Sequence, residues 1–366
     1  MNRPGQVLGT SIAAVAIAVL ALSTVTGCSS SPAHSTSAPT TSASTTTAPD
    51  APGWPSTVIA GDEMHLRDVF VVPDETSGWY YMVGYMGPGP SNIKLYRSKD
   101  LKTWNGPKDQ ATVFSPTPDF WGQGRLGWAP EIHEWKGSWY LFTSFATSDP
   151  PTVDDGDIAG TAILKSDHID GPYEPIVNRP VTPTDRFAID GTLYVDAQGK
   201  PWMAYSQEWI DPRLDSMGRM ALIRLADDFT ETIGTPTELF AATAAPWGIS
   251  QPLLRVVDGP WIHRTEHGEL LMLWSSIGQG GQYVTGIARS TSGTIRGPWV
   301  QQCRPLYDAD GGHAMVFHRF DGQLMVALHT PNKDTEHPLI VPVAERDGTL
   351  VITDPSVPKA SGAACR

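Results

Sequence analysis

The chain has 366 residues, a formal net charge of −13 and only 18% charged residues, whereas 40% of its residues are apolar. This apolar content can build a core, which excludes a disordered chain, and an acidic chain without a Lys/Arg cluster disfavours nucleic acid and anionic membrane surfaces as partners. Gly (35), Pro (32) and Trp (13) are abundant, and turn formers with aromatic residues favour many short β-strands. The tryptophans are typical of sugar-binding proteins, with core packing as the alternative.

Residues 1–27 have the pattern of a secretory signal. Arg3 precedes an apolar run from Ile12 to Leu22, which is too short for a relaxed membrane span, and small residues follow it. The segment ends in VTGC at residues 25–28, which resembles the bacterial lipobox. That resemblance implies cleavage before Cys28 and lipidation of its sulfur, so that acyl chains hold an exported lipoprotein at the outer side of the cytoplasmic membrane. An ordinary secretory signal is the alternative.

Residues 28–55 are almost wholly Ser, Thr, Ala and Pro. Such a segment cannot bury enough apolar surface to offset its ordering entropy, so we expect a lipidated Cys28 followed by a disordered tether. One folded domain is then predicted over residues 56–366.

Cysteine usage is consistent with export. With Cys28 lipidated, Cys303 and Cys365 remain as an even pair, and exported proteins retain disulfides. A disulfide between them would hold the C-terminal tail and close a loop of about 60 residues, worth about 4 kcal/mol in the chain-entropy model. Two free thiols are the alternative.

One pattern recurs five times along the predicted domain. Each copy starts at a titratable residue, continues as an alternating apolar run, turns, and returns as a second strand, which is the pattern of a β-hairpin. The second strands begin at Trp79, Trp139, Trp202, Leu270 and Leu324, with gaps of 60, 63, 68 and 54 residues. Further short strands are expected in the gaps, at residues 93–96, 161–164, 220–225 and 284–288. No gap holds a long amphipathic period, so the pattern predicts an all-β, five-bladed β-propeller with four-stranded antiparallel blades.

The geometry of a propeller gives the first residue of each copy a chemical meaning. The innermost strand of each blade faces the central axis, so residues at the same place in every blade form a ring. We expect this ring to consist of Asp68, Glu131, Asp190, Asp258 and His313. Converging carboxylates spread their pKa values, and one ionised carboxylate facing a protonated one is what glycoside hydrolysis needs. The alternative is that Asp recurs because hairpin entries favour it.

Seven motifs follow one another between about Thr57 and the C-terminus. They are RDVF at 67–70, SKDLKTW at 98–104, WAPEI at 128–132, IDGTL at 189–193, DGPW at 258–261, GPW at 297–299 and GGH at 311–313. Taken together and in order, these motifs resemble glycoside hydrolase family 43. The resemblance implies a five-bladed propeller and an inverting enzyme that acts on arabinose- or xylose-containing glycans without a required cofactor.

Roles follow from the resemblance, residue by residue. Asp68 matches the general base, which activates a water, and Asp190 matches the third carboxylate, which raises the pKa of the acid and orients it. Asp258 stands at the position of the general acid, where the family usually has Glu. Asp is one methylene shorter, and inversion needs the two working carboxyls about 6.5–9.5 Å apart, so Glu208 is the reserve candidate for the acid.

The resemblance also implies substrate-binding residues and a metal position. Trp128, Glu131 and Arg289 match residues that line the sugar pocket, and His65 is a further candidate contact near the first strand. His313 matches a histidine near the channel axis, where the family holds a calcium ion or an ordered water. Calcium prefers oxygen ligands, so a metal-free, hydrogen-bonded histidine is the alternative.

Two long loops and the acid position leave several functions open. Trp121 in residues 114–125 and Trp209 in residues 207–217 predict a narrowed pocket and hence exo action. The first hypothesis is a monomeric, membrane-tethered inverting glycosidase with a carbohydrate substrate. The second is a glycan-binding propeller lipoprotein that lost catalysis, motivated by the missing Glu at position 258. A transglycosidase acting on fructosides is disfavoured because no match to its nucleophile motif is found.

Overall fold

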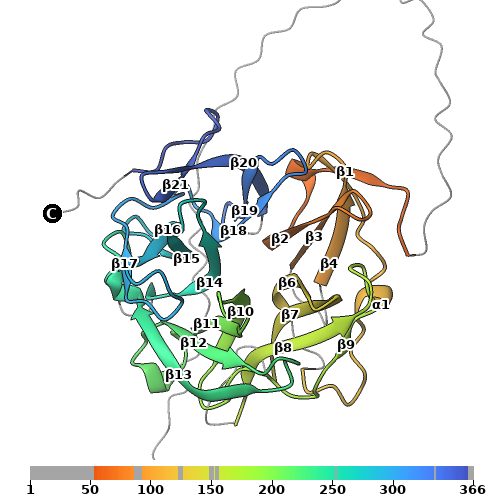
Figure 1. Ribbon diagram of the computed structural model, residues 1–366, viewed down its shortest axis with the longest axis horizontal. Coiled ribbons are helices and arrows are strands. Elements are labelled where there is room, and N and C mark those ends of the chain that lie inside the picture. Colours follow the sequence, from red (N-terminus) through yellow and green to blue (C-terminus); the bar gives the residue numbers. More distant parts are fainter. Residues whose placement is uncertain are drawn as a thin grey trace, which may run out of the picture. The chain divides into compact units, whose positions relative to one another are not determined.

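Five antiparallel β-sheets are arranged as blades around a central axis (Figure 1). The computed structural model describes residues 53–85, 93–122, 127–147, 152, 156–251, 254–333 and 335–361. Four sheets have four strands each, and the first has five because β1 joins its outer edge. The predicted five-bladed β-propeller is therefore confirmed, as are the four third strands expected between the hairpins.

The blades follow one another in chain order. Blade 1 contains β1 (Val58–Ala60), β2 (Arg67–Asp74), β3 (Trp79–Tyr85), β4 (Ile93–Ser98) and β5 (Thr103–Asn105). Blade 2 contains β6 (Trp128–Trp135), β7 (Ser138–Ala146), β8 (Ala159–Ser166) and β9 (Glu174–Pro175). Blade 3 contains β10 (Ala188–Val195), β11 (Pro201–Gln207), β12 (Arg219–Leu225) and β13 (Thr232–Ala241). Blade 4 contains β14 (Asp258–Arg264), β15 (Leu270–Ile277), β16 (Tyr283–Ser290) and β17 (Trp299–Gln301). Blade 5 contains β18 (Gly312–His318), β19 (Leu324–Thr330), β20 (His337–Arg346) and β21 (Thr349–Ile352).

Short helices lie in the connections between strands. They are η1 (Gly61–Glu63), α1 (Gln110–Val113), η2 (Pro212–Leu214) and η3 (Ala242–Ala244).

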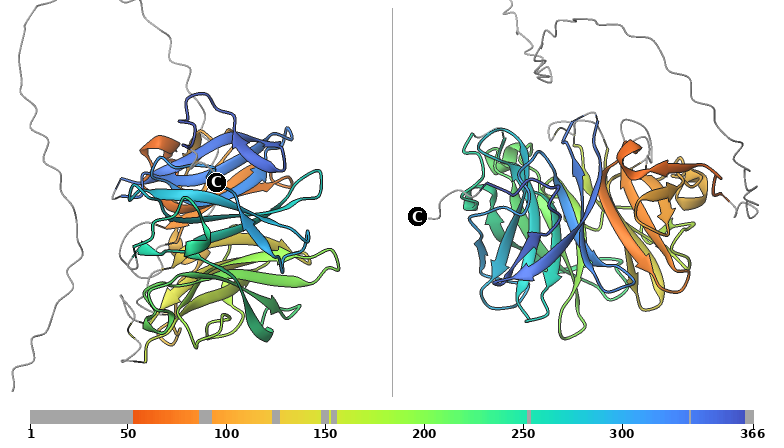
Figure 2. Two further views of the ribbon diagram at one scale, coloured as in Figure 1. Left: turned by 90° about the vertical axis from the view of Figure 1, so that its left-hand side faces the viewer. Right: turned by 90° about the horizontal axis from the view of Figure 1, so that it is seen from above.

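The first strand of each hairpin lies nearest the axis, at β2, β6, β10, β14 and β18 (Figure 1). Each blade is a continuous stretch of chain, and β2 contacts β18 and β19, so the ring closes by packing between blades 5 and 1 without an exchanged strand. Figure 2 shows the first (orange) and last (blue) blades as neighbours from two further sides.

The apolar second strands explain why the sheets pack face to face. In β15 the residues from Leu270 to Ser276 are all buried, because a sheet packs against both of its faces. The seam between blades is rich in large rings; Trp247 and Trp274, for example, lie 5.0 Å apart between ring centroids. Burying each side chain of this size contributes about 1.5–3 kcal/mol.

Aromatic side chains fill the centre of the ring. Phe70 of β2 and Trp261 of β14 lie 5.2 Å apart between centroids, and the ring of His133 from β6 stacks on Trp261 at 6.1 Å. These residues stand three to five positions beyond the start of their strands. The space at the starts of the innermost strands is therefore closed beneath by packed rings.

The predicted signal segment, Cys28 and the predicted tether up to residue 52 lie outside the described residues, as does Cys365. The last three residues of the predicted tether are wrongly assigned, because Trp54 is buried in the domain core and its Nε1 donates to Asp170 Oδ2 at 3.2 Å. Cys303 is disulfide-bonded. Among the residues that the structure describes, no helix has the length and apolar character needed to cross a membrane.

Candidate active site

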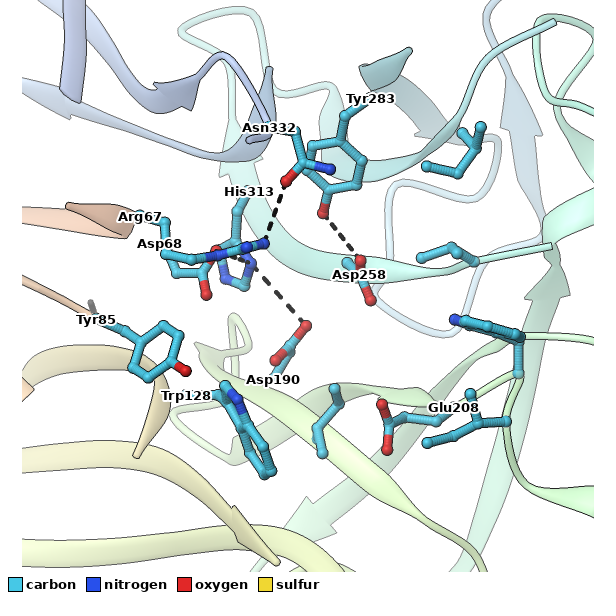
Figure 3. A pocket seen from close by; sticks show the side chains of 15 residues that line it. Arg67, Asp68, Tyr85, Trp128, Asp190, Glu208, Asp258, Tyr283, His313 and Asn332 are labelled. Atoms are coloured by element: carbon cyan, nitrogen blue, oxygen red, sulfur yellow. Dashed lines mark hydrogen bonds and ion pairs between the residues drawn. The ribbon is translucent and has the colours of Figure 1, made fainter. Parts of the chain in front are cut away.

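A cavity of about 390 Å³ opens at the starts of the innermost strands (Figure 3). All five blades contribute to its lining. The lining residues are Arg67, Asp68, Tyr85, Trp128, Ile189, Asp190, Glu208, Trp209, Ile210, Val256, Asp258, Ile277, Tyr283, His313 and Asn332. A concave wall that combines apolar side chains with converging polar groups is typical of a small-molecule site.

A β-bulge near the start of each innermost strand directs these side chains. The register with the second strand shifts at this place in every blade. One residue of each bulge has a left-handed backbone; these are Asp68 (φ 51°), Ala129 (47°), Asp190 (56°), Gly259 (53°) and His313 (55°). Bulges next to active sites re-aim side chains, and here the bulge residues Asp68, Asp190 and His313 line the cavity.

The bulge positions differ from the predicted ring in two blades. The residues in equivalent positions are Asp68, Asp190 and His313, but Ala129 replaces Glu131 and Gly259 replaces Asp258. The sequence placed all five titratable residues in register, which is wrong for blades 2 and 4. Asp258 precedes its bulge residue by one position and still lines the cavity.

Hydrogen bonds between neighbouring blades hold three of the bulges. In each, the bulge N–H donates to a side chain near the end of the second strand of the preceding blade. The bonds join Asp68 N to His329 Nδ1 (3.1 Å), Asp190 N to Ser144 Oγ (2.9 Å) and His313 N to Ser275 Oγ (2.8 Å). Site residues on different blades are thereby held at fixed separations.

Asp68 is a buried carboxylate surrounded by basic groups. Its Oδ1 lies 3.5 Å from Arg67 Nε, 3.5 Å from His313 Nδ1 and 3.4 Å from His329 Nδ1. Burial alone would favour the neutral acid, but the charge of Arg67, followed by that of His313, holds the pKa of Asp68 below its ordinary value. Asp68 is therefore ionised at neutral pH.

The two histidines beside Asp68 differ in charge. Burial lowers the pKa of His329 to about 3, so His329 is neutral and its Nδ1 accepts the Asp68 N–H. Burial also opposes the protonation of His313, but the carboxylates of Asp68 and Asp190 outweigh it and raise the pKa of His313. His313 thus contributes positive charge between these two carboxylates.

Asp190 lies between blades 3 and 4. Its Oδ2 accepts the Gly259 N–H at 3.1 Å and lies 4.0 Å from His313 Nδ1. Burial raises the pKa of Asp190 to about 6, with His313 opposing the shift and Asp68 adding to it.

Asp258 and Glu208 share the rest of the cavity with Asp190. The Tyr283 hydroxyl donates to Asp258 Oδ2 at 3.0 Å. Burial, and then the charge of Asp190, raises the pKa of Asp258 to about 7. Burial, and then the charges of Asp258 and Asp190, raises the pKa of Glu208 to about 8. Among the described residues, the Glu208 carboxyl has no hydrogen-bond partner.

The loop that carries Glu208 is tied to the start of β10. The Glu208 N–H donates to the Phe187 carbonyl (2.9 Å), and the Phe187 N–H donates to Asp211 Oδ2 (2.9 Å). Asp211 is fully buried and also accepts two bonds from the Arg213 guanidinium, at 2.7 and 2.6 Å. Glu208 and Asp190 are consequently positioned by one hydrogen-bonded unit.

The cavity therefore holds carboxyls in opposite states. Asp68 is ionised on one side, and Asp258 and Glu208 hold protons near neutrality on the other. Figure 3 shows Asp190 between Asp68 and Glu208. A proton acceptor and a proton donor around one small cavity can together cleave an acetal by acid–base catalysis.

Three residues predicted to bind substrate do not line the cavity. Glu131 is buried and its Oε2 lies 2.8 Å from His133 Nε2, because it stands two positions beyond the bulge of β6. Arg289 is exposed on β16, the third strand of blade 4, and His65 is exposed before β2. Trp128 does line the cavity.

Only one of the two tryptophans in the long loops lies at the cavity. Trp209 lines the cavity, whereas Trp121 packs against Phe120 and Phe145 (5.8 and 5.9 Å between centroids) and is not a lining residue.

Several lining residues had no predicted role, chiefly Arg67, Tyr85, Tyr283 and Asn332. Tyr85 pairs with Arg67 opposite the bulge, at the position that His329 takes in blade 5. A polar residue at the end of an otherwise apolar second strand was the available signal. It recurs as Tyr85, Ser144, Ser206, Ser275 and His329.

Among the described residues, no set of side chains around His313 matches the ligand sphere of calcium. The His313 Nδ1 faces Asp68 and Asp190, and within the described residues no group of three or more His, Cys, Asp or Glu side chains could hold a metal ion. Calcium takes six to eight oxygen ligands. These residues do not fit the ion by themselves.

Comparison with known proteins identifies the family. Residues 61–350 match the model of glycosyl hydrolases family 43. The chain belongs to this family. It is 26% identical over 156 residues to an extracellular endo-α-(1→5)-L-arabinanase of Bacillus subtilis (40% of this chain, 45% of the relative). It is 25% identical over 281 residues to an extracellular exo-α-(1→5)-L-arabinofuranosidase of Streptomyces avermitilis (70% and 51%). The matched regions thus span about half the length of these two relatives.

A solved structure resembles most of this chain. An endo-arabinase structure from Bacteroides thetaiotaomicron is 40% identical, with a TM-score of 0.71, and the match covers 79% of this chain and 98% of the other. The five-bladed architecture of this chain is thus shared with a relative of known structure.

Proposed function

We propose that this protein is an inverting glycoside hydrolase that cleaves arabinofuranosyl or xylosyl linkages. The observation that carries the proposal is the charge arrangement of the cavity. Asp68 is kept ionised by Arg67, while burial keeps Glu208 protonated in the same cavity. The alternative, a glycan-binding propeller without catalysis, has no need for this separation of proton affinities.

In the proposed mechanism, Asp68 removes a proton from a water that attacks the anomeric carbon. The bond from that carbon to the glycosidic oxygen breaks, and the acid gives its proton to this oxygen. The products are a sugar of inverted configuration and a free hydroxyl on the leaving group. Asp190, held by the Gly259 N–H, would orient the acid and raise its pKa by its charge.

We assign the acid to Glu208, in preference to the sequence-based first choice Asp258. Asp258 has one oxygen engaged by the Tyr283 hydroxyl, and its pKa is about 7. Glu208 has the higher pKa, about 8, and a carboxyl free to meet a glycosidic oxygen. The longer Glu side chain also supplies the reach that Asp258 lacks.

The substrate class is inferred from the relatives and the cavity. The curated relatives are named for α-(1→5)-L-arabinan, with both endo and exo action. A cavity of about 390 Å³ walled by Trp128 and Trp209 suits one or two sugar rings. We therefore favour release of terminal arabinofuranosyl units, with xylosyl units as the second class.

The test uses aryl α-L-arabinofuranosides and β-D-xylosides, with the anomer of the product followed by proton NMR. Wild type should release a sugar of inverted configuration, and Asp68→Asn should lose more than about 10³-fold in kcat/KM while keeping its melting temperature. A folded Asp68→Asn protein with full activity would reject the mechanism. Binding of arabinan oligosaccharides without new reducing ends would support the non-catalytic alternative.

The acid assignment has its own test. Glu208→Gln should lose about 10²–10⁴-fold on alkyl glycosides but much less on dinitrophenyl glycosides, whose leaving group needs no proton. Asp258→Asn is the matched control and should not show this dependence on the leaving group. If the dependence appears in Asp258→Asn alone, Asp258 is the acid.

We propose in addition that the protein is exported and lipid-anchored through Cys28, acting as a monomer. Two relatives are described as extracellular, and the lipobox pattern at residues 25–28 supports the anchor. The full chain should enter the membrane fraction, and Cys28→Ala should move it to the soluble exported fraction. An unchanged distribution would reject the anchor.

A further inference from the structure

Asn332 lines the cavity next to Arg67 and His329, which both lie against Asp68, the proposed base. It follows β19, and its backbone N–H donates to the Asp310 carbonyl at 3.0 Å. Its side-chain oxygen Oδ1 lies 3.2 Å from Arg67 Nη2 and 3.3 Å from His329 Nε2. Figure 3 shows the contact with Arg67.

The donors around Asn332 determine which way its amide faces. His329 Nδ1 accepts the Asp68 N–H, so the proton of this neutral imidazole is on Nε2, which must donate. The Arg67 guanidinium can only donate. Both contacts therefore require the acceptor Oδ1 of Asn332, and the opposite orientation would place two donors against its NH₂ group.

This orientation leaves the Asn332 NH₂ group unused by the protein. Among the described residues no acceptor is bonded to Nδ2, whereas Oδ1 has two donors. Asn332 is partly buried, and a donor in a small cavity without an acceptor costs free energy unless a ligand or water supplies one. A sugar offers hydroxyl oxygens as acceptors.

We propose that Asn332 donates a hydrogen bond from Nδ2 to one hydroxyl oxygen of the sugar whose anomeric carbon faces Asp68, and that this bond helps to select the sugar. The inference rests on the proposed glycosidase function and adds a specificity residue to it. Asn332 is presented by a network that also holds the base, so a sugar with its hydroxyl in the wrong place would leave the amide unpaired beside Asp68.

The test is a double-mutant cycle between Asn332 and the hydroxyls of the sugar. Wild type, Asn332→Asp and Asn332→Ala are assayed on aryl glycosides of the preferred sugar and on its singly deoxygenated analogues. Asn332→Asp is the informative variant, since it retains an acceptor for Arg67 and His329 but replaces the donor with an acceptor. Asn178→Ala, in a loop that does not line the cavity, is the control for asparagine removal.

On the parent glycoside both Asn332 variants should lose about 10–100-fold in kcat/KM. When one hydroxyl is removed from the sugar, the kcat/KM of wild type should fall by a similar factor. The kcat/KM of the two variants should be little lower on this deoxy analogue than on the parent glycoside. Equal losses across the whole panel, or no loss in either variant, would overturn the proposal. Melting temperatures exclude variants that fail to fold, and Asn332→Asp keeps the test open if Asn332→Ala is unstable.

Failure of the proposed function is recognised separately, because wild type would then cleave none of the glycosides. In that case binding of the parent methyl glycoside and its deoxy analogues is measured by calorimetry. Weaker binding of the parent alone by Asn332→Asp supports the contact. Binding that is the same in the variant and wild type overturns it.

Discussion

The backbone N–H of Gly259 donates to Oδ2 of Asp190 across the seam between blades 3 and 4, at 3.1 Å. The bond depends on a residue without a side chain, because a Cβ at position 259 would meet the His313 ring at 2.8 Å. Gly259 of blade 4, which has no side chain, therefore helps to position the Asp190 carboxylate at the centre of the site.

Replacing this glycine should damage both stability and activity. We expect Gly259→Ala to lower the free energy of unfolding by about 2–5 kcal/mol, since a positive φ and a close contact add up. Activity should fall because Asp190 and His313 both shift. Gly268→Ala is the matched control: its φ is also positive (92°), but the added Cβ meets nothing within 4 Å, so a loss of about 1 kcal/mol without loss of activity is expected. Equal losses in urea titrations of the two variants would contradict this account.

Arg67 should control the acidic limb of the pH–rate profile. Arg67 is the largest of the contributions that lower the pKa of Asp68, so Arg67→Gln should raise that pKa. The base would then become protonated at higher pH, and the fall of kcat/KM on the acidic side should move toward neutrality. Profiles of the two proteins between pH 3 and pH 8 test this. An acidic limb in the same place would remove Arg67 from this role.

The alkaline limb of the pH–rate profile should report the pKa of the general acid. Activity needs the acid protonated, so it should fall as the pH rises through about 8 if Glu208 is the donor, and through about 7 if Asp258 is. Because the carboxyls are coupled, the limb reports an apparent value for the group. In Glu208→Gln the residual activity on dinitrophenyl glycosides should lose this limb. A persistent limb near pH 7 would point to Asp258.

The sequence was sufficient for the propeller, because the apolar second strands recur at regular spacing and a strand pattern depends on local alternation. It was not sufficient for the register of the site. Bulge positions depend on backbone conformation, and Ala129 and Gly259 have no chemical signature that marks them. Acid residues close by in the sequence, Glu131 and Asp258, were therefore placed in the ring instead.

The residues that position Asp68 and Arg67 could not be predicted from the sequence for a different reason. His329 and Asn332 lie about 260 residues from Asp68 in the sequence, and only closure of the ring between blades 5 and 1 brings them together. Glu208 was found as a reserve candidate because it ends a predicted hairpin. The contact that distinguishes it from Asp258, the hydroxyl of Tyr283, comes from another strand of blade 4.

Stability should fall as the pH rises from about 4 to above 8. The pKa values of Asp190, Asp258 and Glu208 are raised to about 6, 7 and 8 in the folded protein, against about 4 in unfolded chains. Each of these three groups therefore binds its proton more tightly in the folded state and contributes stability that is complete below pH 4 and lost as the group ionises. His329, whose pKa is lowered to about 3, contributes in the opposite direction between pH 3 and about 6.5, and one group does not outweigh three. Melting temperatures in matched ionic strength should decline toward pH 9, and Glu208→Gln should flatten the decline between pH 7 and pH 9. An identical slope in the variant would contradict the assignment to Glu208.

Asp211 should act on catalysis through Glu208, without touching the substrate. Its carboxylate is fully buried and joins the Phe187 N–H to the Arg213 guanidinium, so Asp211→Ala would leave a buried donor and a cation unpaired. We expect a loss of about 2–4 kcal/mol in the free energy of unfolding. The milder Asp211→Asn keeps an acceptor for Phe187 and should remain folded.

Because the loop that holds Glu208 would loosen, the kcat of Asp211→Asn should fall about tenfold on alkyl glycosides, with KM nearly unchanged. On dinitrophenyl glycosides, which need no acid, the same variant should approach wild type. Arg219→Gln, which removes an exposed ion pair with Glu238 in the same blade, is the control and should leave both substrates unaffected. A uniform loss on both substrates would mean that Asp211 supports the fold of the cavity as a whole, and that Glu208 has no special dependence on it.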